Sequence, residues 1–193
     1  MSHEYLTVYR SRDPRTVFIS DIGAHISEHW DLDRGIPLRG RISEATHLNL
    51  DPEQGDLLCD FISNPEQALI VSERARALLE AEGTLSEEVV EYLPFTLLDK
   101  RGKPTRTRYF FANLLRKVDC MDTAASEFTP AATGGILAVD KVYLRQEHIP
   151  ADVKLFRLGE FPQLHVIRSD LLQRIREAGL TGLEVLAQGK EIF

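Results

Sequence analysis

The chain has 193 residues, of which 43% are hydrophobic and 27% charged, and its 30 acidic and 23 basic side chains give a net charge of −7. This composition excludes a disordered or low-complexity chain. The negative charge disfavours nucleic acid as a partner, because phosphate binding needs a cationic face, and favours a basic protein instead.

The sequence of residues 1–57 predicts an irregular region that is rich in short strands. Two short segments, residues 5–9 and 16–19, have the alternating or continuous hydrophobic pattern of strands, and Asp13-Pro14 between them is typical of a turn. The stretch from Trp30 to Leu38 contains many residues that break regular structure, so no regular element is predicted there.

Two strand–helix–strand units are predicted, near residues 60–98 and 154–187. In each unit an apolar strand leads into a serine-capped amphipathic helix that ends at a glycine, and another apolar strand follows. The residues that recur 97 positions after their first occurrence are Pro162, Ile167, Ser169, Glu177 and Ala178. An internal duplication and the general similarity of strand–helix–strand units both explain this pattern.

The expected fold is a single domain over residues 1–193, with residues 58–193 as its core. A hairpin with a long loop is predicted where two apolar segments, 89–98 and 109–115, flank the turn residues 99–104. The expected class is α+β or α/β, with a mixed, largely antiparallel sheet of six or more strands that carries two or three helices.

The first residues and the cysteines predict the cellular compartment. The N-terminus lacks the charged and apolar regions of a signal peptide, and the longest apolar run, residues 134–139, is too short to cross a bilayer. Cys59 and Cys120 carry no Cys-x-x-Cys pattern and are expected to be buried free thiols. We therefore expect a soluble cytoplasmic protein with no membrane partner.

The segment from His25 to His29 matches the pattern H-x-x-E-H. On a helix, His25 and His29 share a face and can bind zinc, with Glu28 as the general base. A polar surface turn explains the same residues, because the helix would be short and such enzymes need a further carboxylate from a second helix. A metal-dependent hydrolase is therefore the alternative to a protein that is not an enzyme, and no cofactor is expected.

Asp119 and Asp122, with Ser126 nearby, offer two carboxylates that suit magnesium. The other interpretation is that Asp122 caps a short helical turn after a strand. Motifs for a nucleotide-binding loop or a serine nucleophile are absent from the sequence.

Two charge clusters remain. The cationic cluster lies in the predicted hairpin loop and consists of Lys100, Arg101, Lys103, Arg106 and Arg108. It suits a nucleic-acid strand or, more simply, a solvated loop. The acidic cluster has six glutamates and two arginines between residues 73 and 91. The candidate contacts for a basic partner within it are Glu80, Glu82, Glu87, Glu88 and Glu91.

Six short segments occur in a characteristic order: Asp60-Phe61, Ile70–Glu73, Leu93–Phe95, Val118–Asp122, Leu155–Leu158 and Gly179–Glu184. This ordered set, over about residues 57–187, resembles the family-eleven immunity proteins of bacterial polymorphic toxin systems. The stretch Trp30–Leu38 is a weaker match.

The resemblance implies a small cytoplasmic protein that is encoded beside a toxin, often a nuclease, and that binds and blocks it without chemistry. It implies no catalytic residues. Asp119, Asp122 and Ser126 match the family motif, and either a structural or a functional role is open for them. A secretion-system accessory protein is a further alternative.

Overall fold

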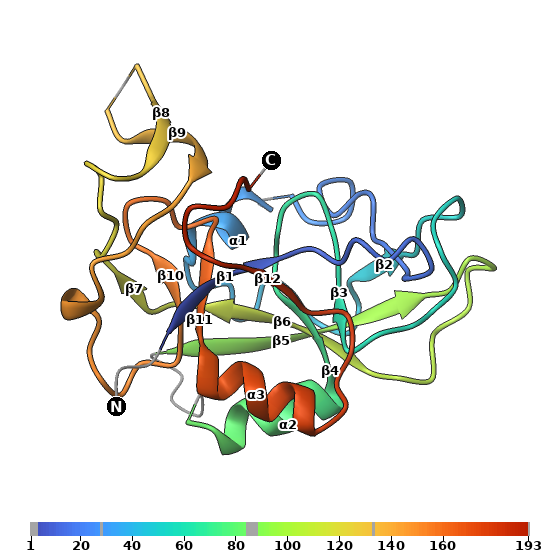
Figure 1. Ribbon diagram of the computed structural model, residues 1–193. Helices are drawn as coiled ribbons and strands as arrows, with labels where there is room; N and C mark the ends of the chain where they lie inside the picture. The colour runs from blue at the N-terminus through green and yellow to red at the C-terminus, as the bar shows by residue number, and fades with distance from the viewer. Residues whose placement is uncertain (1–3, 28, 84–88, 133, 193) are drawn as a thin grey trace.

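Two five-stranded sheets form the body of the described protein (Figure 1). The structure is a computed structural model that describes residues 4–27, 29–83, 89–132 and 134–192. The first sheet, called the β1 sheet, has the order β12-β1-β11-β10-β7, and the second, called the β5 sheet, has the order β2-β5-β6-β4-β3. A separate two-stranded sheet pairs β8 with β9.

The β1 sheet consists of β1 (Tyr5–Tyr9), β7 (Lys117–Val118), β10 (Leu155–Leu158), β11 (His165–Arg168) and β12 (Glu184–Leu186). The β5 sheet consists of β2 (His47–Asn49), β3 (Phe61–Ile62), β4 (Ile70–Ser72), β5 (Val90–Leu98) and β6 (Tyr109–Leu114). The remaining elements are β8 (Glu127–Pro130), β9 (Ile136–Lys141), α1 (Trp30–Arg34), α2 (Glu73–Ala81), α3 (Ser169–Glu177) and a 3-10 turn, η1 (Gln146–His148).

The mixed α+β class is confirmed, because most strand pairs are antiparallel and only β2–β5 and β7–β10 are parallel among the described pairs. The expectation of one sheet with six or more strands is wrong. The strands divide into two sheets because many of them are apolar on both faces, and two facing sheets bury more of that surface than one open sheet does.

The protein has three hydrophobic cores, one between the two sheets and one on the outer face of each sheet. The central core lies between them and joins Val71 and Phe110 of the β5 sheet to Leu155 and Ile167 of the β1 sheet. Along the same strands, every second side chain points to the opposite face of its sheet. Those side chains form two outer cores, one on the outer face of each sheet. The N-terminal loops cover the β5 sheet, and the segment that follows β7 covers the β1 sheet.

Helices α2 and α3 lie side by side at one end of the sheets and close the central core (Figure 1). Both predicted helices form. The Ser72 hydroxyl accepts a hydrogen bond from the Ala75 amide at 3.2 Å and caps α2 as predicted. The predicted serine cap of the second helix is wrong, because Ser169 is already helical and Arg168 holds the N-cap position without a side-chain bond.

The two strand–helix–strand units share one topology. In the β5 sheet the neighbouring strands are β5-β6-β4-β3, and α2 follows β4; in the β1 sheet they are β12-β1-β11-β10, and α3 follows β11. Every neighbouring pair in both sets is antiparallel. In each sheet one strand from outside the unit lies between two strands of the unit. In the β5 sheet this strand is β6, which follows the first unit in the chain, and in the β1 sheet it is β1, which precedes the second unit. This common arrangement supports an internal duplication.

The N-terminal region differs from its prediction in two places. Residues 16–19 form only isolated bridges, from Thr16 to Leu57 and from Phe18 to Ser63. The stretch after Trp30 contains the short helix α1, which ends at Gly35 with a left-handed φ of 58°. Burial of Leu32 in the outer core favours this turn of helix despite its weak local propensity.

The predicted hairpin is confirmed as β5 and β6, with Val90 opposite Leu114 and Phe95 opposite Tyr109. Cys59 and Cys120 are buried free thiols, as expected. Burial raises the pKa of Cys59 to about 11 and that of Cys120 to about 12, so both remain protonated at neutral pH. Within the described chain, no helix is both long and apolar enough to span a bilayer.

Candidate functional site

A buried arginine joins the two sheets to α1. Arg157, on β10, is only 2% exposed, and its guanidinium donates to the backbone carbonyls of Leu32 at 2.6 Å, Leu114 at 2.7 Å and Pro162 at 2.7 Å. Burial lowers its pKa to about 10, which leaves the group charged at neutral pH. A Cβ atom at Gly35 would lie 2.8 Å from the Arg157 Cδ, so the left-handed glycine also provides space for this side chain.

Glu91 continues this polar network. Its carboxylate accepts hydrogen bonds from the Leu38 amide at 2.8 Å and from the Asn113 side chain at 3.1 Å. Asn113 in turn accepts a 3.4 Å bond from Arg157. Glu91 is 5% exposed and therefore does not lie on an acidic surface as expected. Its role in the fold is to hold the segment after α1 against β5 and β6.

The other glutamates of the predicted acidic face are largely paired or outside the described residues. Glu80 forms an ion pair with Arg76 at 2.8 Å. Glu82 pairs with Lys154 at 2.8 Å and with Arg174 at 3.2 Å, so it links α2 to α3. Those two partners hold the pKa of Glu82 below its usual value. Glu87 and Glu88 lie outside the described residues.

The cationic cluster surrounds the loop between β5 and β6. Lys100 pairs with Asp56 at 2.8 Å, and Arg108 pairs with Glu44 at 2.6 Å. The Asp99 carboxylate accepts bonds from two amides of the same loop and fixes its turn. These contacts fit a solvated, internally paired loop.

The histidines of the H-x-x-E-H segment do not share a helical face. His25 lies in a turn, with its Nε2 3.4 Å from the Asn49 side-chain nitrogen, and His29 holds the N-cap position of α1. Glu28 lies outside the described residues. The alternative of a zinc-binding helix over both histidines is therefore wrong, because the chain turns at Gly23 and α1 begins only at Trp30. Within the described residues, no group of three or more potential ligands is placed to hold a metal ion.

His29 instead belongs to a half-buried polar cluster with Asp33 and Glu66. One atom of each side chain is buried without a hydrogen-bond partner in the described part of the chain: His29 Nδ1, Asp33 Oδ1 and Glu66 Oε2. Burial raises the pKa of Asp33 to about 6, against the opposing effect of the Arg157 charge. Burial also raises the pKa of Glu66.

Replacing Asp33 by asparagine is expected to stabilise the protein at pH 7.5. Because the folded pKa of about 6 exceeds the unfolded value near 3.9, the folded state holds the proton more tightly, and stability falls as pH rises between these values. The gain should be about 1 kcal/mol, allowing for solvent screening of a half-buried group, and should vanish near pH 4. Urea unfolding at both pH values measures it. Asp152→Asn, at an exposed ion pair, is the control and should show no such pH dependence.

Asp122 and Ser126 hold the base of the β8–β9 hairpin, and Asp119 lies against the turn after β10. The Asp122 carboxylate accepts bonds from the amides of Ala124 at 3.1 Å and Ala125 at 3.3 Å, so it caps a turn. The Ser126 hydroxyl accepts from the Tyr143 amide at 2.9 Å. The Asp119 carboxylate lies over Gly159, where a Cβ atom would collide with it. All three side chains therefore have structural contacts.

The β8–β9 hairpin stands away from the two large sheets (Figure 1). Val139 is fully buried at its root, and Phe128 and Ile136 pack partly against the outer core of the β1 sheet. Leu137 is 67% exposed, and Tyr143, just after the hairpin, is 39% exposed. An exposed leucine on a projecting hairpin is a candidate protein contact. The sequence showed this apolar run but not that it projects into solvent.

Asp60 joins the two strand–helix–strand units. Its carboxylate accepts a 2.6 Å bond from the Ser72 hydroxyl, at the start of α2, and a 3.0 Å bond from the Thr181 amide, after α3. A Cβ atom at Gly182 would lie 2.2 Å from the Phe61 carbonyl, so glycine is required for this close approach. Residues in three of the six resembling segments thus form one structural joint.

Comparison with known proteins identifies a family. No curated protein matches the chain. The model of an immunity protein family (Imm11) matches residues 7–190, which is nearly the whole chain and includes nearly all of both sheets. The match confirms the resemblance seen in the sequence, and the chain belongs to this immunity protein family.

Proposed function

We propose that the protein is the immunity partner of a toxin encoded by an adjacent gene, which it binds and blocks in the cytoplasm of the producing cell. The family match over residues 7–190 carries this proposal. The net charge of −7 supports a basic toxin, such as a nuclease that must hold phosphate. Occlusion of the toxin's active surface requires only tight binding and no turnover.

The β8–β9 hairpin is the contact surface that we favour. Leu137 supplies an exposed apolar anchor, and the family-matching residues Asp122 and Ser126 fix the base from which the hairpin projects. A backbone that is fixed before binding reduces the conformational entropy lost when the hairpin meets a partner. The second candidate is the acidic cluster predicted from the sequence, with Glu80, Glu82, Glu87 and Glu88 but without the buried Glu91.

Leu137→Asp is expected to weaken toxin binding at least tenfold, because it places a charge where an apolar anchor becomes desolvated. Its unfolding free energy should stay within about 0.5 kcal/mol of the wild type, since the side chain is exposed. Leu57→Asp is the matched control, because Leu57 is 48% exposed in the loop between β2 and β3. Surface plasmon resonance on the purified pair measures both variants.

The same measurement separates the two candidate surfaces. If the acidic cluster is the contact, a variant with Glu87→Lys and Glu88→Lys should associate more slowly with a basic toxin than the wild type does. Loss of affinity in Leu137→Asp alone supports the hairpin. Loss in the lysine variant alone would indicate that the acidic cluster is the contact and would refute the choice of the hairpin.

Co-expression tests the proposed function itself. The product of the adjacent gene, produced alone, should arrest growth, and this chain should restore growth and co-purify with the toxin in a fixed ratio. If that neighbour is toxic but is neither bound nor neutralised, the proposal is wrong.

A further inference from the structure

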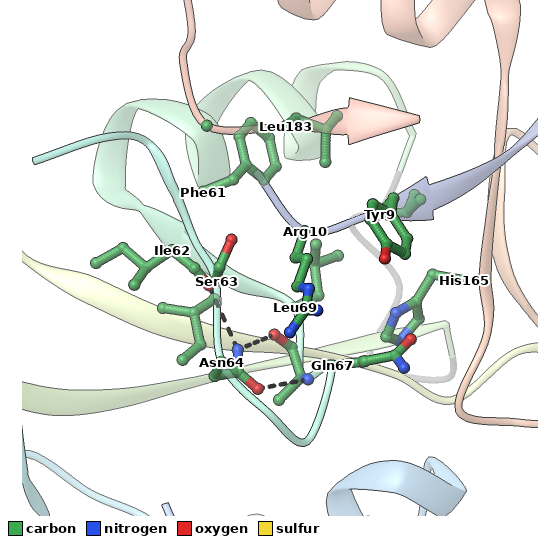
Figure 2. Close-up of a pocket in the computed structure, with 14 residues that line it drawn as sticks. Tyr9, Arg10, Phe61, Ile62, Ser63, Asn64, Gln67, Leu69, His165 and Leu183 are labelled. Carbon is green, nitrogen blue, oxygen red and sulfur yellow. Dashed lines mark hydrogen bonds between the residues drawn. The ribbon is translucent and has the colours of Figure 1, made fainter. Parts of the chain in front are cut away.

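A small cavity lies where the two large sheets meet (Figure 2). Its volume is about 40 Å³, which is enough for a group of the size of one or two water molecules. Tyr9 and Arg10 at the end of β1 line it together with His165 on β11, and residues 61–64 and 67–70 line the opposite wall. None of the lining residues is an aspartate or a glutamate.

Several hydrogen-bonding groups that line this cavity have no protein partner. His165 is only 3% exposed, and its Nε2 has no hydrogen bond within the described residues. Gln67 is partly buried and Arg10 is exposed to solvent, and neither side chain has a hydrogen bond or ion pair in that part of the chain, so both are free to bind a ligand. Buried polar groups in folded proteins are nearly always paired, so an unpaired imidazole at a cavity indicates a ligand.

The loop that carries Gln67 is held in a strained conformation. Gln67 has a φ of 55° and is the one non-glycine residue with positive φ in the described chain. Asn64 fixes this loop: its side chain accepts from the Ala68 amide at 2.9 Å and donates to the Ala68 carbonyl at 2.7 Å. Such strain persists where the surrounding structure imposes it, and it is common at binding sites.

The available groups favour an acceptor with negative charge. Burial and the nearby Arg157 charge hold the pKa of His165 well below its usual range, so its imidazole is neutral and presents one N–H. Gln67 offers two amide hydrogens, and Arg10 offers a guanidinium with a full positive charge. Asn64 in the same wall is already occupied by its backbone bonds.

We propose that this cavity binds one carboxylate group, with Arg10, Gln67 and His165 as its hydrogen-bond donors. A charge-assisted bond from Arg10 and the planar Gln67 amide suit the two carboxylate oxygens. The carboxylate belongs either to a small free acid or to an aspartate or glutamate side chain of a partner protein. The site does not depend on the proposed immunity function.

Titration with sodium acetate tests the site on the full-length protein. In ¹H–¹⁵N spectra of histidine-labelled protein, the His165 ring signals should shift and saturate with acetate but not with methylammonium chloride at equal ionic strength. Arg10→Ala should weaken the apparent affinity at least tenfold, and Gln67→Ala should weaken it several-fold. Arg106→Ala, which removes an equal charge in the exposed loop between β5 and β6, is the control and should bind like the wild type. Testing Arg10 and Gln67 leaves the buried strand residue His165 intact.

A response that does not saturate, that methylammonium reproduces, or that survives Arg10→Ala would overturn the site. Once the site is established, a competition experiment between acetate and the toxin assigns the source of the carboxylate. If acetate competes with the toxin, a toxin side chain occupies the cavity. If acetate and toxin bind together without competition, the ligand is a free acid. Since the acetate titration uses no toxin, its failure is distinct from failure of the immunity proposal.

Discussion

Replacing Arg157 with alanine is expected to destabilise the protein by about 3–5 kcal/mol. The guanidinium is the donor for carbonyls from α1, from the end of β6 and from the loop after β10, and the substitution leaves them buried without it. It also opens a cavity beside Gly35. Urea unfolding monitored by circular dichroism should show a lower midpoint with an unchanged slope.

Arg116→Ala is the matched control for this experiment. Arg116 is an arginine of the neighbouring strand region whose exposed ion pair with Asp152 spans 3.4 Å, and its loss should cost no more than about 0.5 kcal/mol. Arg157→Lys should recover only part of the stability, because one ammonium cannot reach all three carbonyls. An effect of Arg157→Ala as small as that of the control would contradict the role of this network.

Glu91→Ala is expected to cost about 2–3 kcal/mol, the second largest effect. The carboxylate accepts from the Leu38 amide and the Asn113 side chain, and the substitution leaves both donors buried without it. Differential scanning calorimetry should show a lower Tm. Glu73→Ala, in the first turn of α2, is the exposed control and should leave Tm nearly unchanged.

The Glu91 variant also separates a structural role from toxin binding. We expect the fraction of Glu91→Ala that remains folded to bind the toxin as tightly as the wild type. Weaker binding by the folded variant, with unchanged stability, would restore Glu91 as a contact residue.

Local patterns in the sequence were sufficient for much of the fold. The Ser72 cap, the helix after it and the hairpin formed by β5 and β6 depend on neighbouring residues, and all three are confirmed. The division into two sheets depends on which apolar faces meet, which is a long-range property. It could not be read from the strands one at a time.

In the candidate site, too, local patterns could be predicted from the sequence and long-range contacts could not. Glu91 alternates with Leu93, Phe95 and Leu97, and this period of two would have placed it on the buried face of the strand. Charge counting along the chain overlooked that register. The ion pairs of Glu82 with Lys154 and Arg174 were not predictable, since their partners lie more than 70 residues away in the sequence.

The central claim is that the protein neutralises its toxin by binding. The most direct measurement mixes the purified toxin domain with increasing amounts of this protein and records the remaining toxin activity. Occlusion predicts a linear fall to zero at one fixed ratio of the two proteins, independent of incubation time. Complete inactivation by a small fraction of that amount, progressing with time, would show catalysis instead, and undiminished toxin activity at any ratio would contradict the immunity function.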